Sequence, residues 1–237
     1  MNERKKIVLA KHLIGKGGWV SLYGFNTEGG RREILARNNG HFKAAKCLVL
    51  YVDKNVWEKL RAENSSGLPT FLRRLKAIGL SNFQVFLLAV DRPLTYSDSL
   101  DLAGLTANHQ LELSGGVADA VDKDAIATGV RETYEEYGCT AADVAMTAPL
   151  VAEGAHVAYD AGGQVEIYSI SVAVVTQKPS PPRREGTIPD KCVLVPLLEA
   201  EEFLMEQGRQ GILLEGLALT ALSHLGLALH GGWNSLR

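Results

Sequence analysis

The chain has 237 residues, enough for one large domain or two small ones. It is 46% hydrophobic and 22% charged, with a formal net charge of −2, so it lacks the basic excess that nonspecific nucleic-acid binding requires. The three cysteines, Cys47, Cys139 and Cys192, are odd in number and far apart, which indicates reduced thiols and no disulfide framework. We therefore expect a cytoplasmic protein without a nucleic-acid partner.

Two segments bear on membrane targeting, and neither favours it. The N-terminus starts with basic residues, but its apolar run extends only from Ile7 to Ala10, which is too short for a signal peptide. The most apolar segment, 212–229, contains Glu215 and His224, whereas a membrane span needs about 20 apolar residues with few charges. We predict a buried C-terminal helix there and no membrane association.

The first part of the chain shows turn, strand and helix patterns in that order. Residues 19–25 and 31–37 flank Thr27-Glu28-Gly29-Gly30, a composition typical of a hairpin turn. Residues 45–52 and 83–90 are short apolar runs and predict central strands. Between them, 54–80 has apolar residues at helical spacing, which predicts one or two short helices interrupted at 65–69.

The second part predicts a helix between strands and two closing helices. Residues 109–113 alternate like a strand that Gly115-Gly116 breaks. A helix is expected from a cap at Asp122 or Asp124 to Tyr137, ending at Gly138. The remaining expected elements are strands at 145–152, 165–176 and 192–195, a proline-rich loop at 177–190, and helices at 198–207 and 212–228. The strands and helices mix without regular βαβ alternation, which favours an α+β fold.

Three carboxylates cluster on the predicted helix. Glu132, Glu135 and Glu136 share one face, since residues three and four apart on a helix are neighbours. Like charges at that spacing cost about 0.2–0.5 kcal/mol per pair, so water or a cation must compensate them. A solvated acidic face is one interpretation. The other is a magnesium site, which usually accompanies phosphate chemistry.

Gly115-Gly116, a loop, and the run Arg131-Glu132-Thr133-Tyr134-Glu135-Glu136-Tyr137-Gly138 together resemble the Nudix box. The helical half matches this motif, except that Thr133 stands where an aliphatic residue or alanine is usual. The loop half departs from it. Asp122 occupies the place of the usual glutamate, and the spacing from Gly116 to Arg131 is one residue longer.

The longer spacing is similar to the box of the UDP-sugar diphosphatase branch of the family. Other segments agree with that branch: the strand that ends in Asp91-Arg92-Pro93, the Leu111-Glu112-Leu113 lead-in, and Val195-Pro196-Leu197 before two helices. The resemblance covers residues 19–228. It implies a metal-dependent hydrolase, with Mg²⁺ or alternatively Mn²⁺, that cleaves the diphosphate of a nucleoside diphosphate sugar. The substrate would be of the UDP-sugar type or the ADP-ribose type.

The resemblance also implies an α+β architecture, an α/β/α sandwich with a mixed sheet, an N-terminal β-hairpin extension and C-terminal helices. We expect residues 1–40 to form the strand extension that mediates a homodimer, and residues 41–237 to form the hydrolase domain with a helical insertion at 54–80. That insertion could shape a lid, extend the dimer or only decorate the fold.

The resemblance assigns roles to individual residues. The predicted metal ligands are Gly116, through its carbonyl, and Glu132, Glu135 and Glu136. The predicted catalytic residues are Arg131, which orients the carboxylates, Glu132, and Glu185, the only glutamate in the 183–190 loop and the candidate base. Arg92 is expected to contact the diphosphate or the nucleotide, and Gln164 the sugar or the base. Each could instead be an ordinary surface, turn or loop residue.

Two other functions remain open. One is a Nudix hydrolase for other nucleoside diphosphate derivatives, such as dinucleoside polyphosphates. The other is a Nudix-fold nucleotide-binding protein with impaired catalysis. The altered loop favours the second, because Asp122 replaces the usual glutamate and no second acid stands near position 187. The three clustered glutamates argue against it.

Overall fold

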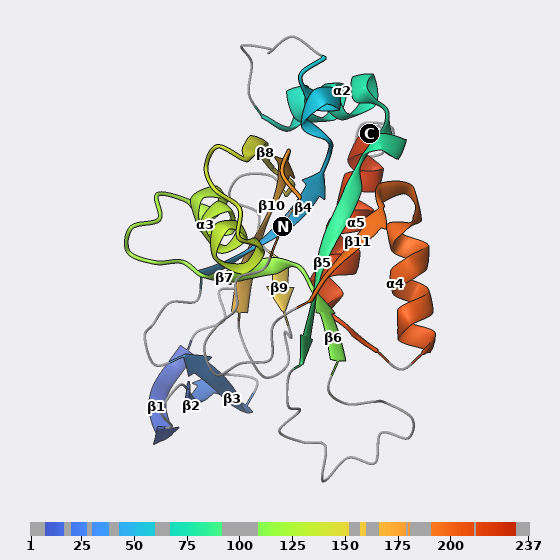
Figure 1. Ribbon diagram of the computed structural model, residues 1–237. Coiled ribbons are helices and arrows are strands. Elements are labelled where there is room, and N and C mark those ends of the chain that lie inside the picture. Colours follow the sequence, from blue (N-terminus) through green and yellow to red (C-terminus); the bar gives the residue numbers. More distant parts are fainter. Residues whose placement is uncertain are drawn as a thin grey trace.

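The computed structural model describes residues 8–16, 20–27, 30–37, 43–59, 67–91, 109–151, 157–159, 166–178, 180, 191–210 and 212–230. Within these residues the chain forms two sheets (Figure 1). The smaller one contains β1 (Val8–Lys16), β2 (Val20–Thr27) and β3 (Gly30–Arg37). Strands β2 and β3 pair as the antiparallel hairpin that the turn composition predicts, and β1 adds an unpredicted third strand.

The central sheet is mixed, and nine of the described strands belong to it. Its main path runs β12-β6-β5-β4-β10-β8, while β11 pairs with β5, β7 with β4 and β9 with β10. The long strands are β4 (Lys43–Tyr51), β5 (Gln84–Asp91) and β10 (Glu166–Val175). The others are β6 (His109–Glu112), β7 (Ser114–Val117), β8 (Val144–Pro149), β9 (Val157–Tyr159), β11 (Lys191–Pro196) and β12 (Leu213–Leu214). Strands β4 and β10 pair in parallel at the centre.

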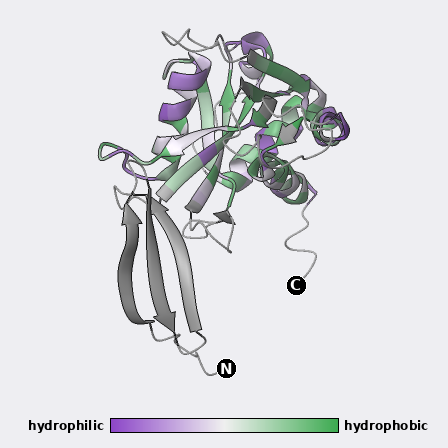
Figure 2. Ribbon diagram, turned by 90° about the horizontal axis from the view of Figure 1, so that it is seen from below, coloured by the Kyte–Doolittle hydropathy of each residue, from purple (hydrophilic) through white to green (hydrophobic). Residues whose placement is uncertain are grey.

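Helices cover both faces of this sheet. One face carries α3 (Ala125–Tyr137), and the other carries α2 (Leu68–Ile78), α4 (Ala200–Arg209) and α5 (Gly216–Leu229) (Figure 1). The short helix α1 spans Lys54–Trp57, and the single turns η1 and η2 span Leu80–Asn82 and Leu197–Glu199. The predicted α+β class with a mixed sheet between helices is confirmed. Figure 2 shows the hydrophobic strands lying between the helical layers.

Burial on both faces explains why the central strands are mostly apolar, with Lys46 of β4 as a buried exception. Along β4, Leu48 and Leu50 contribute to the core under α2, α4 and α5, while Cys47 and Val49 contribute to the smaller core under α3. The predicted insertion is part of the larger core, since Trp57, Phe71 and Leu75 are buried there.

The helix that carries the carboxylates begins and ends on local signals. Asp124 is its N-cap and accepts a hydrogen bond from the Ala127 N–H at 2.8 Å, so the cap is Asp124 and not Asp122. Gly138 ends the helix in the left-handed conformation, with φ 65°, which favours glycine. Gly129 lets the helix approach the sheet closely, because a Cβ there would lie 2.7 Å from Ser171 Oγ.

The expectation that Gly115-Gly116 break the strand is wrong. Both glycines lie inside β7, where they pair with Lys46 and Ala45 of β4. Pairing leaves no room for side chains, since a Cβ on Gly115 would lie 2.3 Å from the Ala45 carbonyl oxygen. The chain changes its pairing partner earlier, at Leu113. Strand β6 before it pairs with β5, and strand β7 after it pairs with β4.

Candidate active site

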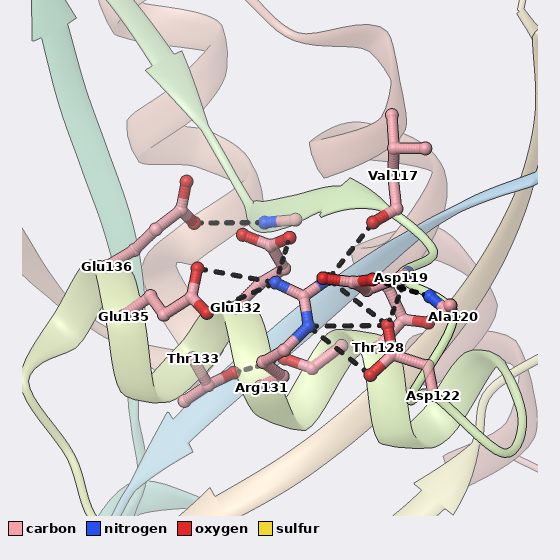
Figure 3. Close-up of polar contacts among 12 residues, drawn as sticks. Val117, Asp119, Ala120, Asp122, Thr128, Arg131, Glu132, Thr133, Glu135 and Glu136 are labelled. Carbon is pink, nitrogen blue, oxygen red and sulfur yellow. Dashed lines mark hydrogen bonds and ion pairs between the residues drawn. The ribbon is translucent and has the colours of Figure 1, made fainter. Parts of the chain in front are cut away.

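The candidate site lies between α3 and β7, and Arg131 is its centre (Figure 3). The guanidinium pairs with three carboxylates: Glu132 at 2.8 Å, Glu135 at 3.2 Å and Asp122 at 3.2 Å. It also donates a hydrogen bond to the Val117 carbonyl at 3.0 Å. One arginine therefore joins the helix, the end of β7 and the loop between them.

Asp122 anchors Arg131 from the loop. Its side chain is 5% exposed, and its carboxylate accepts hydrogen bonds from Arg131 and from the Asp119 N–H. Partial desolvation raises the pKa of Asp122, but these hydrogen bonds outweigh it and hold the pKa below its ordinary value. In the sequence, Asp122 departs from the motif and is a candidate helix cap, with no predicted role in the site. The structure shows that the shorter acid still reaches the arginine.

The two glycines of β7 give the helix its close approach to the strand. A Cβ on Gly116 would lie 2.2 Å from Glu132 Oε1, so only glycine leaves space for that carboxylate. The Gly115 N–H donates a hydrogen bond to Glu136 Oε2 at 3.0 Å. The predicted residues Gly116, Glu132 and Glu136 are thus brought together at one edge of the helix.

The two glutamates beside β7 differ from Glu135, which is 52% exposed and faces Arg131. Glu132 is only 12% exposed. Desolvation raises the pKa of Glu136 to about 7, although the Gly115 N–H and the charge of Lys46 act in the opposite direction. Four carboxyl groups therefore gather near a single arginine, and negative charge is in excess there even with Glu136 partly protonated near pH 7.

We tested this donor set against a divalent cation. In the described part of the chain, no three His, Cys, Asp or Glu side chains converge as a ready metal cage. Mg²⁺, however, is usually held by one or two carboxylates together with water and substrate phosphates. Glu132 and Glu136 beside the glycine strand fit that requirement, because both supply oxygen donors in a region of excess negative charge.

Three predicted site residues lie outside the described residues: Arg92, Gln164 and Glu185. Their roles remain predictions. The sequence patterns also predicted no role for a buried cluster of Lys46, Glu112 and Glu215, in which Lys46 lies on the same face of β4 as Leu48. The cluster joins residues far apart in the chain, and only the isolated charges within apolar runs could have indicated it.

No family model and no curated protein matches this sequence. Solved structures do match. A crystal structure described as an ADP compounds hydrolase aligns with a TM-score of 0.57 at 14% identity, over 98% of this chain and 97% of that chain. The chain has a Nudix-type fold. The predicted fold is confirmed by this match, whereas the UDP-sugar branch is not specifically supported.

Two further structures align less well. An Ap4A hydrolase from C. elegans has a TM-score of 0.42 at 15% identity, over 80% of this chain and 98% of that chain. The Nudix hydrolase RenU from M. smegmatis has a TM-score of 0.38 at 15% identity, over 94% and 98%. In the described part of the chain, no helix has the length and hydrophobicity needed to cross a membrane.

Proposed function

We propose that this chain is a metal-dependent hydrolase of phosphoanhydride bonds, acting on a nucleoside diphosphate linked to a sugar. The observation that carries the proposal is the arrangement of Glu132 and Glu136 against Gly115-Gly116, held in place by Arg131. The Nudix-type fold supports it. The products would be a nucleoside monophosphate and a sugar phosphate.

Each residue has a stated task in this proposal. Glu132, Glu136 and the Gly116 carbonyl would hold the cation, with Glu135 at the exposed side. The cation, when bound, neutralises phosphate charge and lowers the pKa of an attacking water. Arg131 fixes the direction of Glu132 and Glu135 by charged hydrogen bonds and does not touch substrate.

The remaining tasks fall to residues outside the described part of the chain. Arg92 would contact the diphosphate, Gln164 the sugar or base, and Glu185 would act as general base. For this role, Glu185→Gln should lower kcat about 10²- to 10⁴-fold, because a positioned base typically contributes that factor. Steady-state kinetics with Mg²⁺ measures this. Near-normal kcat would remove Glu185 from the mechanism.

Two observations bear on the substrate. The resemblance of the loop spacing and flanking segments favours UDP-sugars. The structural match to an ADP compounds hydrolase supports ADP-ribose and its relatives. A panel containing UDP-glucose, ADP-ribose and a dinucleoside polyphosphate, each with Mg²⁺, distinguishes them by the nucleoside monophosphate released. We also propose a homodimer through residues 1–40, which light scattering of the full chain would test.

The rival function is nucleotide binding without catalysis. Its support was the altered loop, but Asp122 still bonds Arg131, so the replacement leaves the arginine anchored. Turnover that disappears in Glu136→Gln would establish the enzyme. Tight nucleotide binding with no turnover on the whole panel would instead establish the binding protein.

A further inference from the structure

Leu113 is the residue at which the chain changes partners within the sheet. The preceding strand, β6, pairs with β5 through Glu112 opposite Leu88, and the following strand, β7, pairs with β4 through Ser114 opposite Cys47. Leu113 belongs to neither ladder and is wholly buried. Buried backbone groups need hydrogen-bond partners, so both its N–H and its carbonyl require one from elsewhere.

Two side chains supply those partners. Glu215 Oε2 accepts a hydrogen bond from the Leu113 N–H at 2.9 Å, and Lys46 Nζ donates one to the Leu113 carbonyl at 3.2 Å. The same two side chains form an ion pair, with Lys46 Nζ 2.7 Å from Glu215 Oε1. Glu112 Oε2 lies 3.6 Å from the ammonium. The ion pair therefore supplies the hydrogen bonds that a neighbouring strand would otherwise give to the Leu113 backbone.

The cluster is also held firmly from the α5 side. Glu215 is the residue before α5, and its own N–H donates a hydrogen bond to the Leu111 carbonyl at 3.0 Å. Strand β12 pairs in parallel with β6 immediately before it. The lysine and the glutamate are each more than nine-tenths buried. A buried ion pair is weak evidence for stability, since apolar replacements often serve as well. The hydrogen bonds of both side chains to the Leu113 backbone point to a more specific role.

Strand β7 separates this cluster from the candidate active site. Successive residues of a strand face opposite sides of the sheet. Gly116 faces Glu132 of α3, whereas a Cβ on Gly115 would lie 2.4 Å from Lys46 Cδ. The stem of Lys46 therefore lies against the back of the strand whose front receives Glu132 and whose Gly115 N–H bonds Glu136. A displacement of Leu113 would move both glycines.

We propose that the Lys46–Glu215 ion pair is a positioning device for the active site, fixing Leu113 and thereby placing Gly115 and Gly116 against the carboxylates of α3. The proposal rests on the function proposed above. Lys46 and Glu215 touch neither substrate nor metal. They act through the backbone of β7, and the charge of Lys46 also lowers the pKa of Glu136 across the strand.

The test compares Lys46→Met with Leu204→Ala, a control that opens a cavity in the core at a buried residue of α4. Both changes lower stability, so assays are run well below the unfolding temperature. Three quantities are measured: Mn²⁺ affinity by electron paramagnetic resonance, hydrogen exchange of the 109–117 segment, and kcat. For Lys46→Met we expect faster exchange of that segment and losses of about tenfold or more in Mn²⁺ affinity and kcat, as for outer-shell residues of metal sites. The control should change none of them.

A second pair of variants covers failure of Lys46→Met to fold. Glu215→Gln keeps one acceptor oxygen, enough for the Leu113 N–H or for Lys46 but not for both, whereas Glu215→Leu removes both. The glutamine variant should therefore lose less Mn²⁺ affinity than the leucine variant. Because Lys46→Met also removes a charge that acts on Glu136, hydrogen exchange of the 109–117 segment decides its outcome. Equal Mn²⁺ affinity in the two Glu215 variants, or exchange in Lys46→Met equal to that of the control, would overturn the proposal. If the unaltered protein hydrolyses nothing, the proposed function fails. The positioning role is then still decided by Mn²⁺ affinity and hydrogen exchange.

Discussion

The α3 face and the α5 face of the central sheet each carry a cluster of ionised side chains. On the α5 face, Lys46 and Glu215 are 8% and 9% exposed, and the backbone of Leu113 takes up their remaining hydrogen bonds. On the α3 face, Arg131 is 23% exposed and Glu135 is 52% exposed. The first cluster is closed to solvent, and the second is open to it.

The two clusters also differ in charge balance. One lysine is shared by two glutamates in the closed cluster, and each carboxylate lies close to the ammonium. In the open cluster one arginine pairs with three carboxylates, while Glu136 accepts a hydrogen bond from the Gly115 N–H. An open cluster with excess negative charge suits a cation and its phosphates. A closed cluster with nearly balanced charge is suited to holding the Leu113 backbone in place.

Among the residues that the structure describes, Glu136→Gln should have the largest effect. Glutamine keeps an acceptor for the Gly115 N–H but removes the charge that would hold a cation, so we expect kcat to fall at least about 100-fold. Because a partly desolvated carboxylate is lost, the melting temperature should not fall. Steady-state kinetics and thermal unfolding of the same preparation measure both. Turnover equal to that of the unaltered protein would exclude Glu136 from the site.

A smaller loss is expected for Gly116→Ala. The added Cβ would lie 2.2 Å from Glu132 Oε1 and must displace that carboxylate. Displacement of a catalytic group costs up to about 100-fold, so we expect a kcat between about 10- and 100-fold lower. The matched control is Gly226→Ala in α5, where a Cβ meets nothing within 4 Å.

This control should be fully active and more stable, by up to about 1 kcal/mol, because alanine favours helix interiors. Denaturant unfolding measures that gain. If Gly116→Ala were as active as Gly226→Ala, the close packing of β7 against Glu132 would have no catalytic importance.

The sequence predicted the helix of the open cluster but not the closed cluster. The helix that carries the open cluster was readable from Asp124, the i, i+3 and i+4 carboxylates, and Gly138, since all of these act within a few residues. The central strands were readable as apolar runs. The three-residue and two-residue strands β9 and β12 were missed, because such short pairings leave no periodicity in the sequence.

The closed cluster could not be predicted, for a different physical reason. Lys46 and Glu215 lie far apart in the chain, and each looks like an isolated charge in an apolar segment. Their partner is the backbone of Leu113, whose need for hydrogen bonds arises only from the strand order. The prediction for Gly115-Gly116 was wrong because it also depended on the strand order. In sequence, a glycine that permits close strand packing looks like one that makes a turn.

The smallest expected effect is on stability, and it tests whether Asp122 anchors Arg131 or is an ordinary surface acid. Asp122→Asn removes a charged hydrogen bond to Arg131. We therefore expect the free energy of unfolding at pH 7 to be about 1 kcal/mol lower than that of the unaltered protein. Because the pKa of Asp122 is held below its ordinary value when folded, its contribution is present above that value and is lost as the pH falls through and below it. Urea unfolding at pH 7 and near pH 3 should therefore show that the difference in unfolding free energy between the two proteins shrinks in acid.

Glu58→Gln is the control, because Glu58 is 60% exposed and lies 3.8 Å from Lys54. Its unfolding free energy should change little at either pH. A pH-independent difference for Asp122→Asn would mean that its carboxylate charge does not anchor Arg131, and the open cluster would then be held by the helix alone.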